Sequence, residues 1–204
     1  MYKKIIIVLC LFLFTGCTNT YYMNSLSYEE ILNYATIEEN DLHNTNNKGF
    51  KYYLPTGFSV IKDDNFNQTL TSHNNIYYLN IDVVSYYYKK GTEETKEIDD
   101  YYFYKFNKNG KDGYLRIRKN NDKFIVELCY NYAIIEVEVE ESEIKYAVSR
   151  GITILNSVKY NDTVIEKKLN DKDLESKETA YKIPEPKEKN ETKNVLEYIN
   201  ENEE

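Results

Sequence analysis

Residues 101–140 constrain the fold of this chain more than any other segment, because their turn signals and their alternating apolar residues agree on one register. Asn109-Gly110 is the strongest kind of two-residue signal for a β-hairpin turn. A turn there places three aromatic side chains opposite apolar or small residues of the next strand. The predicted pairs are Tyr104–Leu115, Tyr102–Ile117 and Phe106–Gly113.

Two further turns complete this pattern. The second lies within residues 119–122, and a turn at Asn121-Asp122 would give the register below; the third lies near Asn131-Tyr132, where the apolar residues change from even to odd positions. Without the third turn, a one-residue slip would bury Glu136 and Glu138. The predicted pairs are Leu115–Leu128, Ile117–Val126, Leu128–Ile135, Val126–Val137 and Phe124–Val139, with Arg116 against Glu127 on the reverse face. The segment therefore predicts a four-stranded antiparallel meander with one apolar face.

Amphipathic helices flank the predicted strands. Apolar residues recur at helical spacing over residues 144–158, directly after the meander, so we expect this helix to cover the apolar face of the sheet. Ser27 and Glu30 form a capping box that begins an N-terminal helix ending near Ile37. The predicted fold class is therefore α+β: a tyrosine-rich antiparallel sheet covered by an N-terminal and a C-terminal helix.

Strand signals also fill residues 50–88. A hairpin is expected at Pro55, and a second turn at residues 73–75. Alternation after the second turn predicts one long strand over residues 76–88, with its odd-numbered side chains as far as Val83 on one face.

The composition changes after residue 165. Residues 166–204 are charged and nearly free of large apolar side chains, which is typical of a disordered, acidic tail. A short amphipathic helix through Val195, Leu196 and Ile199 that docks on a partner is the alternative. Residues 27–165 are expected to form a single α+β domain.

The N-terminus has the parts of a secretory signal: a basic flank, an apolar run over residues 5–14 and a small-residue end. Phe14-Thr15-Gly16-Cys17 resembles the lipobox of bacterial lipoproteins, with Phe14 where that family usually has Leu. The resemblance implies a signal peptide over residues 1–16, acylated Cys17 with a tether over residues 17–26, and a place on the outer face of the cell membrane. The alternatives are a secreted protein in which Cys17 is incidental, or an uncleaved anchor. Heavy use of Asn, Lys, Ile and Tyr is typical of a low-GC Gram-positive genome.

A second resemblance covers residues 27–162. The stretch YYLPTGFSVI at residues 52–61 and the closing ILNSVKYN at residues 154–161 are similar in pattern to the PsbP/Mog1-like sandwich. Members of that fold mostly serve as accessory or binding proteins. The resemblance implies non-enzymatic work and transfers no site residue.

Charge and cysteine content exclude several classes. A formal net charge of −8 leaves no basic footprint for nucleic acid and disfavours direct binding to an anionic membrane. With Cys10 in the signal and Cys17 acylated, Cys129 has no disulfide partner. His43 and His73 are too few for a zinc site without carboxylates. We expect no metal and no cofactor.

No catalytic constellation is evident in the spacing of reactive residues. Both histidines fall in predicted loops, without a nucleophile at a recognisable distance. The acid pairs Asp63-Asp64 and Asp99-Asp100 are typical of turns, and adjacent side chains on a strand point to opposite faces.

Tyrosine is the one residue type that indicates binding, since Tyr outnumbers Phe 22 to 8. The candidate partner-binding residues have outward-facing rings on their predicted strands: Tyr86, Tyr88, Tyr101 and Phe103. The N-terminal helix would abolish this patch if it covered the same face.

The leading hypothesis is a lipid-anchored, extracytoplasmic binding or adaptor protein whose partner is an envelope protein or wall glycan. The alternatives are a small cell-envelope hydrolase acting on wall glycan or peptide, and a structural lipoprotein whose tail spaces it from the wall.

Overall fold

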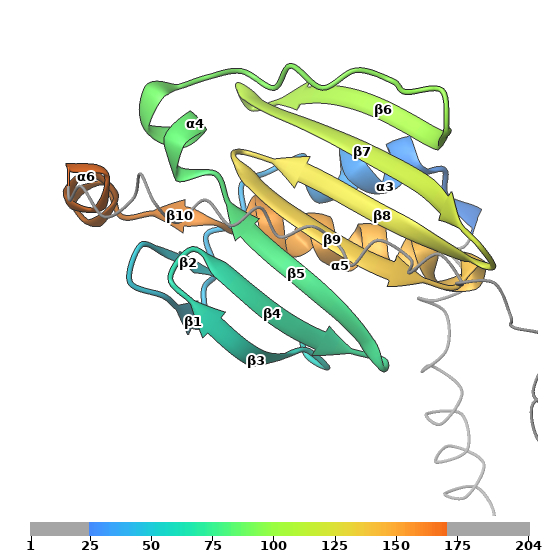
Figure 1. Ribbon diagram of the computed structural model, residues 1–204, viewed down its shortest axis with the longest axis horizontal. Coiled ribbons are helices and arrows are strands. Elements are labelled where there is room, and N and C mark those ends of the chain that lie inside the picture. The colour runs from blue at the N-terminus through green and yellow to red at the C-terminus, as the bar shows by residue number, and fades with distance from the viewer. Residues whose placement is uncertain (1–24, 171–204) are drawn as a thin grey trace, which may run out of the picture. The chain divides into compact units, whose positions relative to one another are not determined.

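The computed structural model describes residues 25–170, which form an α+β fold with two antiparallel sheets (Figure 1). The predicted signal peptide, Cys17, most of the tether and residues 171–204 lie outside the described residues. No helix among the described residues is long and apolar enough to cross a membrane.

The larger sheet has seven strands, all paired antiparallel, in the order β3-β4-β5-β9-β8-β7-β6. Their bounds are β3 Ser59–Asp64, β4 Asn67–Ser72, β5 Asn75–Ile81, β6 Asp100–Lys108, β7 Lys111–Asn120, β8 Lys123–Tyr130 and β9 Ala133–Val139. The meander β6 to β9 thus joins the meander β3 to β5 through the pairing of β5 with β9. One continuous sheet results.

The predicted register of the 101–140 meander is confirmed at every pair. Tyr104 faces Leu115, and Phe106 lies over Gly113, where an added Cβ would come within 2.6 Å of the phenyl ring. Arg116 faces Glu127 on the reverse side. The remaining predicted pairs are also observed: Tyr102–Ile117, Leu115–Leu128, Ile117–Val126, Leu128–Ile135, Val126–Val137 and Phe124–Val139. Local turn chemistry and apolar parity were sufficient here because each constrains the other.

Helix α5 (Ile144–Asn156) packs against β8 and β9, and helix α3 (Tyr28–Ala35) packs against α5 (Figure 1). The capping box of α3 is present, with Ser27 accepting from the Glu30 backbone N–H at 3.2 Å. The ring of Tyr28 lies 5.0 Å from that of Tyr102, whose strand neighbour Ile117 is fully buried. Both helices therefore lie on the same, apolar face, and α3 does not cover the reverse face.

The predicted hairpin at Pro55 is wrong. Strand β2 (Phe50–Tyr52) pairs with β1 (Thr45–Asn46) and with β10 (Lys159–Tyr160) in the small sheet, whereas β3 pairs with β4. Phe50 and Tyr52 are both buried, and the Tyr52 hydroxyl donates to Gln68 on β4 at 2.7 Å. Pro55 thus lies in a crossing between two sheets, because β2 buries its rings over the large sheet rather than extending it.

The predicted long strand over residues 76–88 ends early. Tyr77, Leu79 and Ile81 share the buried face as expected, but residues 83–88 form helix α4 (Val83–Tyr88). Asp82 caps this helix, because its carboxylate accepts from the Ser85 backbone N–H at 2.8 Å. The N-cap residue Asp82 therefore begins a helix in a segment whose alternating residues, β-branched residues and tyrosines had predicted a strand.

Helix α6 (Asp162–Asn170) crosses the predicted boundary between domain and tail at residue 165. Ile165 is buried in the core, and the helix continues beyond the predicted boundary to Asn170. The 3-10 turn η1 (Glu141–Glu143) precedes α5.

Candidate functional site

The face of the large sheet opposite α5, here called the outer face, carries polar and aromatic side chains in rows across the strands. One row contains Tyr114, Cys129 and Ile134 on β7, β8 and β9. The next row contains Arg116, Glu127 and Glu136 on the same strands. A charged group is enclosed here, since Arg116 is only 3% exposed.

Arg116 is enclosed because residues 89–99, here called the covering loop, lie over it. Its guanidinium approaches Glu94 at 3.0 Å and Glu97 at 3.4 Å, and it donates to the Thr95 carbonyl at 2.8 Å. Asp100, which follows the loop, lies 3.2 Å from Nε. Burial disfavours the charge of Arg116, but the surrounding carboxylates outweigh burial and raise its pKa. One cation thus fastens a loop that has no regular secondary structure.

Aromatic rings and a lysine support the same loop. The Arg116 guanidinium lies 5.3 Å from the ring centre of Phe103 and 5.7 Å from that of Tyr114, within the range of cation–π contacts. Lys105 on β6 donates to the Thr92 carbonyl. Two side chains of the sheet, Lys105 and Arg116, therefore hold the covering loop at separate points along its length.

A pocket of about 340 Å³, the outer-face pocket, lies where the covering loop, α4 and the sheet meet. Tyr114, Cys129 and Ile134 line it from the sheet, and Tyr132 lines it from the turn between β8 and β9. The remaining lining residues come from the start of α4 and from the covering loop: Asp82, Ser85, Lys90, Gly91, Thr92, Glu93 and Glu94. Its volume lies within the usual range of small-molecule sites.

The two potential nucleophiles of this pocket, the Cys129 thiol and the Tyr114 hydroxyl, are held in their protonated forms. Burial, together with the nearby Glu127 carboxylate, raises the pKa of the Cys129 thiol to about 12. Burial and the same carboxylate raise the pKa of Tyr114 well above its usual value, and its hydroxyl donates to Glu127. Thiolate and phenolate are therefore scarce at neutral pH, which favours binding over nucleophilic chemistry.

Two carboxylates stand opposite each other in the adjacent row. Glu127 lies 3.1 Å from Arg118 and accepts from Tyr114, so its charge is compensated. Burial and the neighbouring Glu127 raise the pKa of Glu136 to about 7. A carboxyl group with a raised pKa beside a second carboxylate is a feature of acid–base sites as well as of strained structural pairs.

The four predicted partner-binding residues do not share one face. Tyr86 and Tyr88 lie on α4, and Tyr101 and Phe103 on β6. The Tyr86 hydroxyl donates to Asp162 at 2.5 Å and its ring lies 4.0 Å from that of Tyr160, so it joins α4 to α6. Phe103 stacks near Tyr114 beneath the covering loop. The premise of an outward strand face is wrong for Tyr86 and Tyr88, which lie on a helix, and for Tyr101, whose ring lies 5.0 Å from that of Phe124 on the apolar face. Only Tyr88 and Tyr101 of the four are exposed by more than half, at 64% and 55%.

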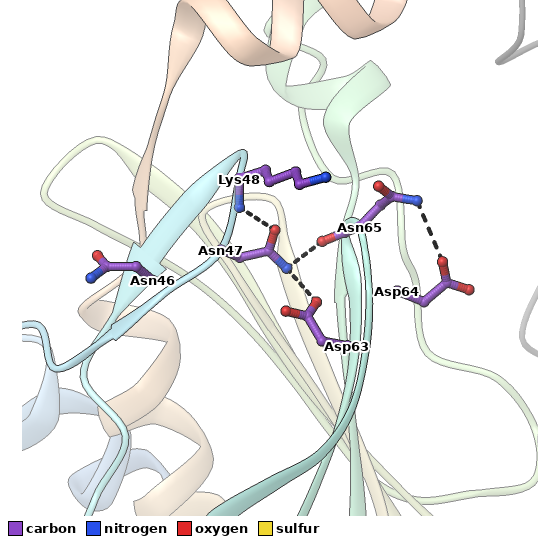
Figure 2. A pocket seen from close by; sticks show the side chains of 6 residues that line it. All are labelled: Asn46, Asn47, Lys48, Asp63, Asp64 and Asn65. Atoms are coloured by element: carbon purple, nitrogen blue, oxygen red, sulfur yellow. Dashed lines mark hydrogen bonds between the residues drawn. The ribbon is translucent and has the colours of Figure 1, made fainter.

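A second hollow, of about 500 Å³, lies between the β1–β2 turn and the β3–β4 turn (Figure 2). In Figure 2 the Asn47 amide points towards β3 and donates to Asp63 at 2.7 Å and to the Asn65 carbonyl, while Asn46 points away. Lys48 and Asp64 complete its lining. Its central amide is therefore engaged in tying the small sheet to the edge of the large one.

The histidines are not paired with carboxylates in the described part of the chain. Nδ1 of His43 lies 3.3 Å from the Asp41 carbonyl, and Nε2 lies 3.5 Å from Nζ of Lys51. The His73 ring stacks on Tyr146 at 4.5 Å. Residues 25–170 also bring together no group of three or more side chains that could hold a metal ion.

Comparison of the sequence with protein-family models and with curated proteins gives no match. The arrangement of the outer face is therefore the basis for a functional assignment.

One feature of the sequence, the charge pattern around Arg116, could have indicated this site. The pairing of Arg116 with Glu127 on the reverse face was predicted, and the covering loop contributes Glu94 and Glu97 shortly before the arginine-bearing strand. A buried arginine facing an acidic loop could have been proposed from that charge pattern. The contribution of α4 and of Tyr132 could not, because both depend on where the chain leaves the sheet.

Proposed function

We propose that this chain is a lipoprotein of the bacterial cell envelope, held on the outer face of the membrane through acylated Cys17, and that its domain is a non-enzymatic binding module. The anchor is supported by the apolar run over residues 5–14 and the lipobox-like Phe14-Thr15-Gly16-Cys17. Two acyl chains hold a protein at a membrane far more firmly than one. A PsbP/Mog1-like architecture, typical of accessory proteins, is part of the same proposal.

The outer-face pocket is the observation that carries the binding role. It combines a cavity of about 340 Å³ with a floor of Tyr114, Cys129 and Ile134 and a wall fastened by Arg116. Its thiol and its buried phenol are held protonated. A preformed pocket whose reactive groups are suppressed is suited to holding a ligand rather than turning it over.

Metabolic labelling tests the anchor. The full-length chain, expressed in a bacterium that processes lipoproteins and fed an alkyne-bearing palmitate, should incorporate the label and remain with the membrane. Cys17→Ala should lose the label, whereas Cys129→Ala should keep it. Equal labelling of the wild type and Cys17→Ala would overturn the anchor.

Capture of envelope components tests the pocket. The full-length protein, solubilised from membranes, should retain an envelope protein or co-sediment with purified wall glycan. Ile134→Arg should abolish this, because Ile134 lines the pocket. Ile125→Arg is the matched control. Ile125 lies on β8 and faces the same outer side of the sheet as Ile134, but it does not line the pocket. Loss in both variants, or in neither, would contradict binding through the pocket.

A small envelope hydrolase acting on wall glycan or peptide is the second candidate, and one observation favours it. Glu127 and Glu136 stand opposite each other, and burial raises the pKa of Glu136 to about 7. A glycosidase uses one such protonated acid beside an ionised carboxylate. Release of soluble wall fragments by the wild type but not by Glu136→Gln would establish this activity, and equal release by both would exclude this pair.

A further inference from the structure

We propose that the outer-face pocket binds a small organic ammonium ion. This inference rests on the proposed binding role of the same pocket and assigns it a ligand class. Three features of the pocket support this ligand class: the charge of its lining, the tyrosine Tyr132 in its wall and the unusual backbone conformation of that tyrosine.

The lining is acidic. Three of its side chains are carboxylates, Asp82, Glu93 and Glu94, against the single ammonium of Lys90. Asp82 and Glu94 are engaged, since Asp82 accepts from the Ser85 N–H and Glu94 pairs with Arg116. Glu93 forms no ion pair within the described part of the chain, so its charge is available to a ligand. Such a lining attracts a cation and repels an anion.

Tyr132 provides the second attraction for a cation. It lines the wall, whereas the ring of Tyr114 on the floor already lies 5.7 Å from the Arg116 guanidinium. Aromatic rings attract cations through their negative faces, and organic ammonium ions are bound in proteins by rings of this kind. Ile134 and the protonated Cys129 thiol leave an apolar surface for the carbon body of the ligand. The pocket therefore suits an ammonium group attached to a short apolar chain.

Tyr132 occupies a backbone conformation that does not favour a tyrosine. Its φ is +65°, in the two-residue turn that joins β8 to β9, and Asn131 before it has φ +53°. Glycine is preferred at the second position of such a turn, because it has no Cβ to clash. The ring partly compensates through an edge contact with Tyr86 at 5.6 Å. A glycine at residue 132 would thus suit the turn while removing one wall of the pocket, which separates binding from folding.

Saturation-transfer NMR on the full-length protein in detergent tests the proposal, with n-butylammonium as the probe and n-butanol and butyrate as neutral and anionic matches. We expect saturation transfer to n-butylammonium at least fivefold stronger than to either match, and weaker at high salt. Tetramethylammonium, in a parallel arm, distinguishes a quaternary from a primary ammonium preference. Equal transfer to butylammonium, butanol and butyrate would overturn the proposal.

Three variants of the pocket lining, one that removes an aromatic ring and two that remove opposite charges, extend this test. Tyr132→Gly should reduce transfer at least fivefold with an unchanged unfolding midpoint. Glu93→Gln should weaken transfer about threefold, and Lys90→Gln should strengthen it. Asp122→Asn, an exposed carboxylate in the β7–β8 turn, is the control and should have no effect. If Tyr132→Gly unfolds, the two surface variants decide, and identical transfer in both would refute the cation preference.

Failure here is distinguishable from failure of the proposed function. Palmitate labelling reports on Cys17 alone, and Ile134→Arg reports on any ligand of the pocket. Retention of an envelope component that Ile134→Arg abolishes, without any ammonium binding, would refute the ligand class and leave the binding role in place.

Discussion

Nε of Arg116 lies 3.2 Å from Oδ1 of Asp100, and the two side chains are almost fully enclosed, at 4% and 0% exposed. Asp100 also accepts from the Glu97 backbone N–H at 2.7 Å, so the same carboxylate closes the end of the covering loop. Removing one partner of a buried ion pair leaves an uncompensated charge. The pair therefore holds the loop that forms one wall of the outer-face pocket.

Replacing Arg116 by methionine should lower the free energy of unfolding by about 3–5 kcal/mol, because Asp100 then stays buried without its cation. Urea denaturation measures this. Lys119→Met, an exposed position on the same strand, should change stability by less than about 0.5 kcal/mol. Adding Asp100→Asn to Arg116→Met should recover part of the loss, and a loss below about 1 kcal/mol in the single variant would contradict a structural role for the pair.

Glu136 should make stability fall as the pH rises. Its pKa is raised from 4.5 to about 7 in the folded chain, so the folded state binds its proton more tightly than the unfolded state. This contribution is present below pH 4.5 and is lost as the pH rises through 7. Glu136→Gln should therefore be more stable than the wild type at pH 8, by about 2 kcal/mol after allowance for partial exposure. Urea midpoints at pH 5, 6, 7 and 8 measure the effect, and parallel curves for both proteins would contradict it.

Gly113 should not tolerate a methyl group. An added Cβ would lie 2.6 Å from Cζ of Phe106 and 2.7 Å from the Cys129 carbonyl oxygen. Gly113→Ala should cost about 1–3 kcal/mol of stability, since the backbone oxygen cannot rotate away. Gly91→Ala is the control, because its Cβ would come no closer than 3.4 Å to Asp112. A thermal midpoint lowered equally by both variants would show that the contact with Phe106 is not the cause.

Cys129 should resist alkylation in the folded protein. It is 6% exposed and its pKa is raised to about 12, so thiolate is scarce below pH 9. Iodoacetamide should modify the peptide that carries Cys129 more than a hundredfold faster in 8 M urea than in buffer, as followed by mass spectrometry. Rapid modification of the folded chain would show that the Cys129 thiol is not held protonated.

The meander over residues 101–140 could be predicted in detail because its constraints are local and mutually consistent. Asn109-Gly110 specifies a tight turn, and the change of apolar parity at residue 132 demands another. The capping box at Ser27 and the apolar spacing of α5 are similarly local. Each of these features depends on neighbours within a few residues or on the adjacent strand.

The predictions from the sequence are wrong where a segment distant in sequence, rather than the neighbouring one, provides the packing partner. Residues 83–88 have strand composition, but Asp82 caps a helix there, and Tyr86 packs on Tyr160 of β10. Residues 50–52 would suit a hairpin at Pro55, but they pair with β10 instead. In both cases a partner more than seventy residues away in sequence offers more burial than the nearest one.

The sequence by itself therefore determined the α+β class, the register of four strands, the apolar face and the helix that covers it, because alternation, turns and caps act over short distances. Only the tertiary structure decided what lies on the reverse face. The covering loop has no periodicity, and its position depends on Arg116 bringing together carboxylates from separate parts of the chain. The outer-face pocket is formed between that loop, α4 and the β8–β9 turn, so it exists only once long-range contacts have placed all three.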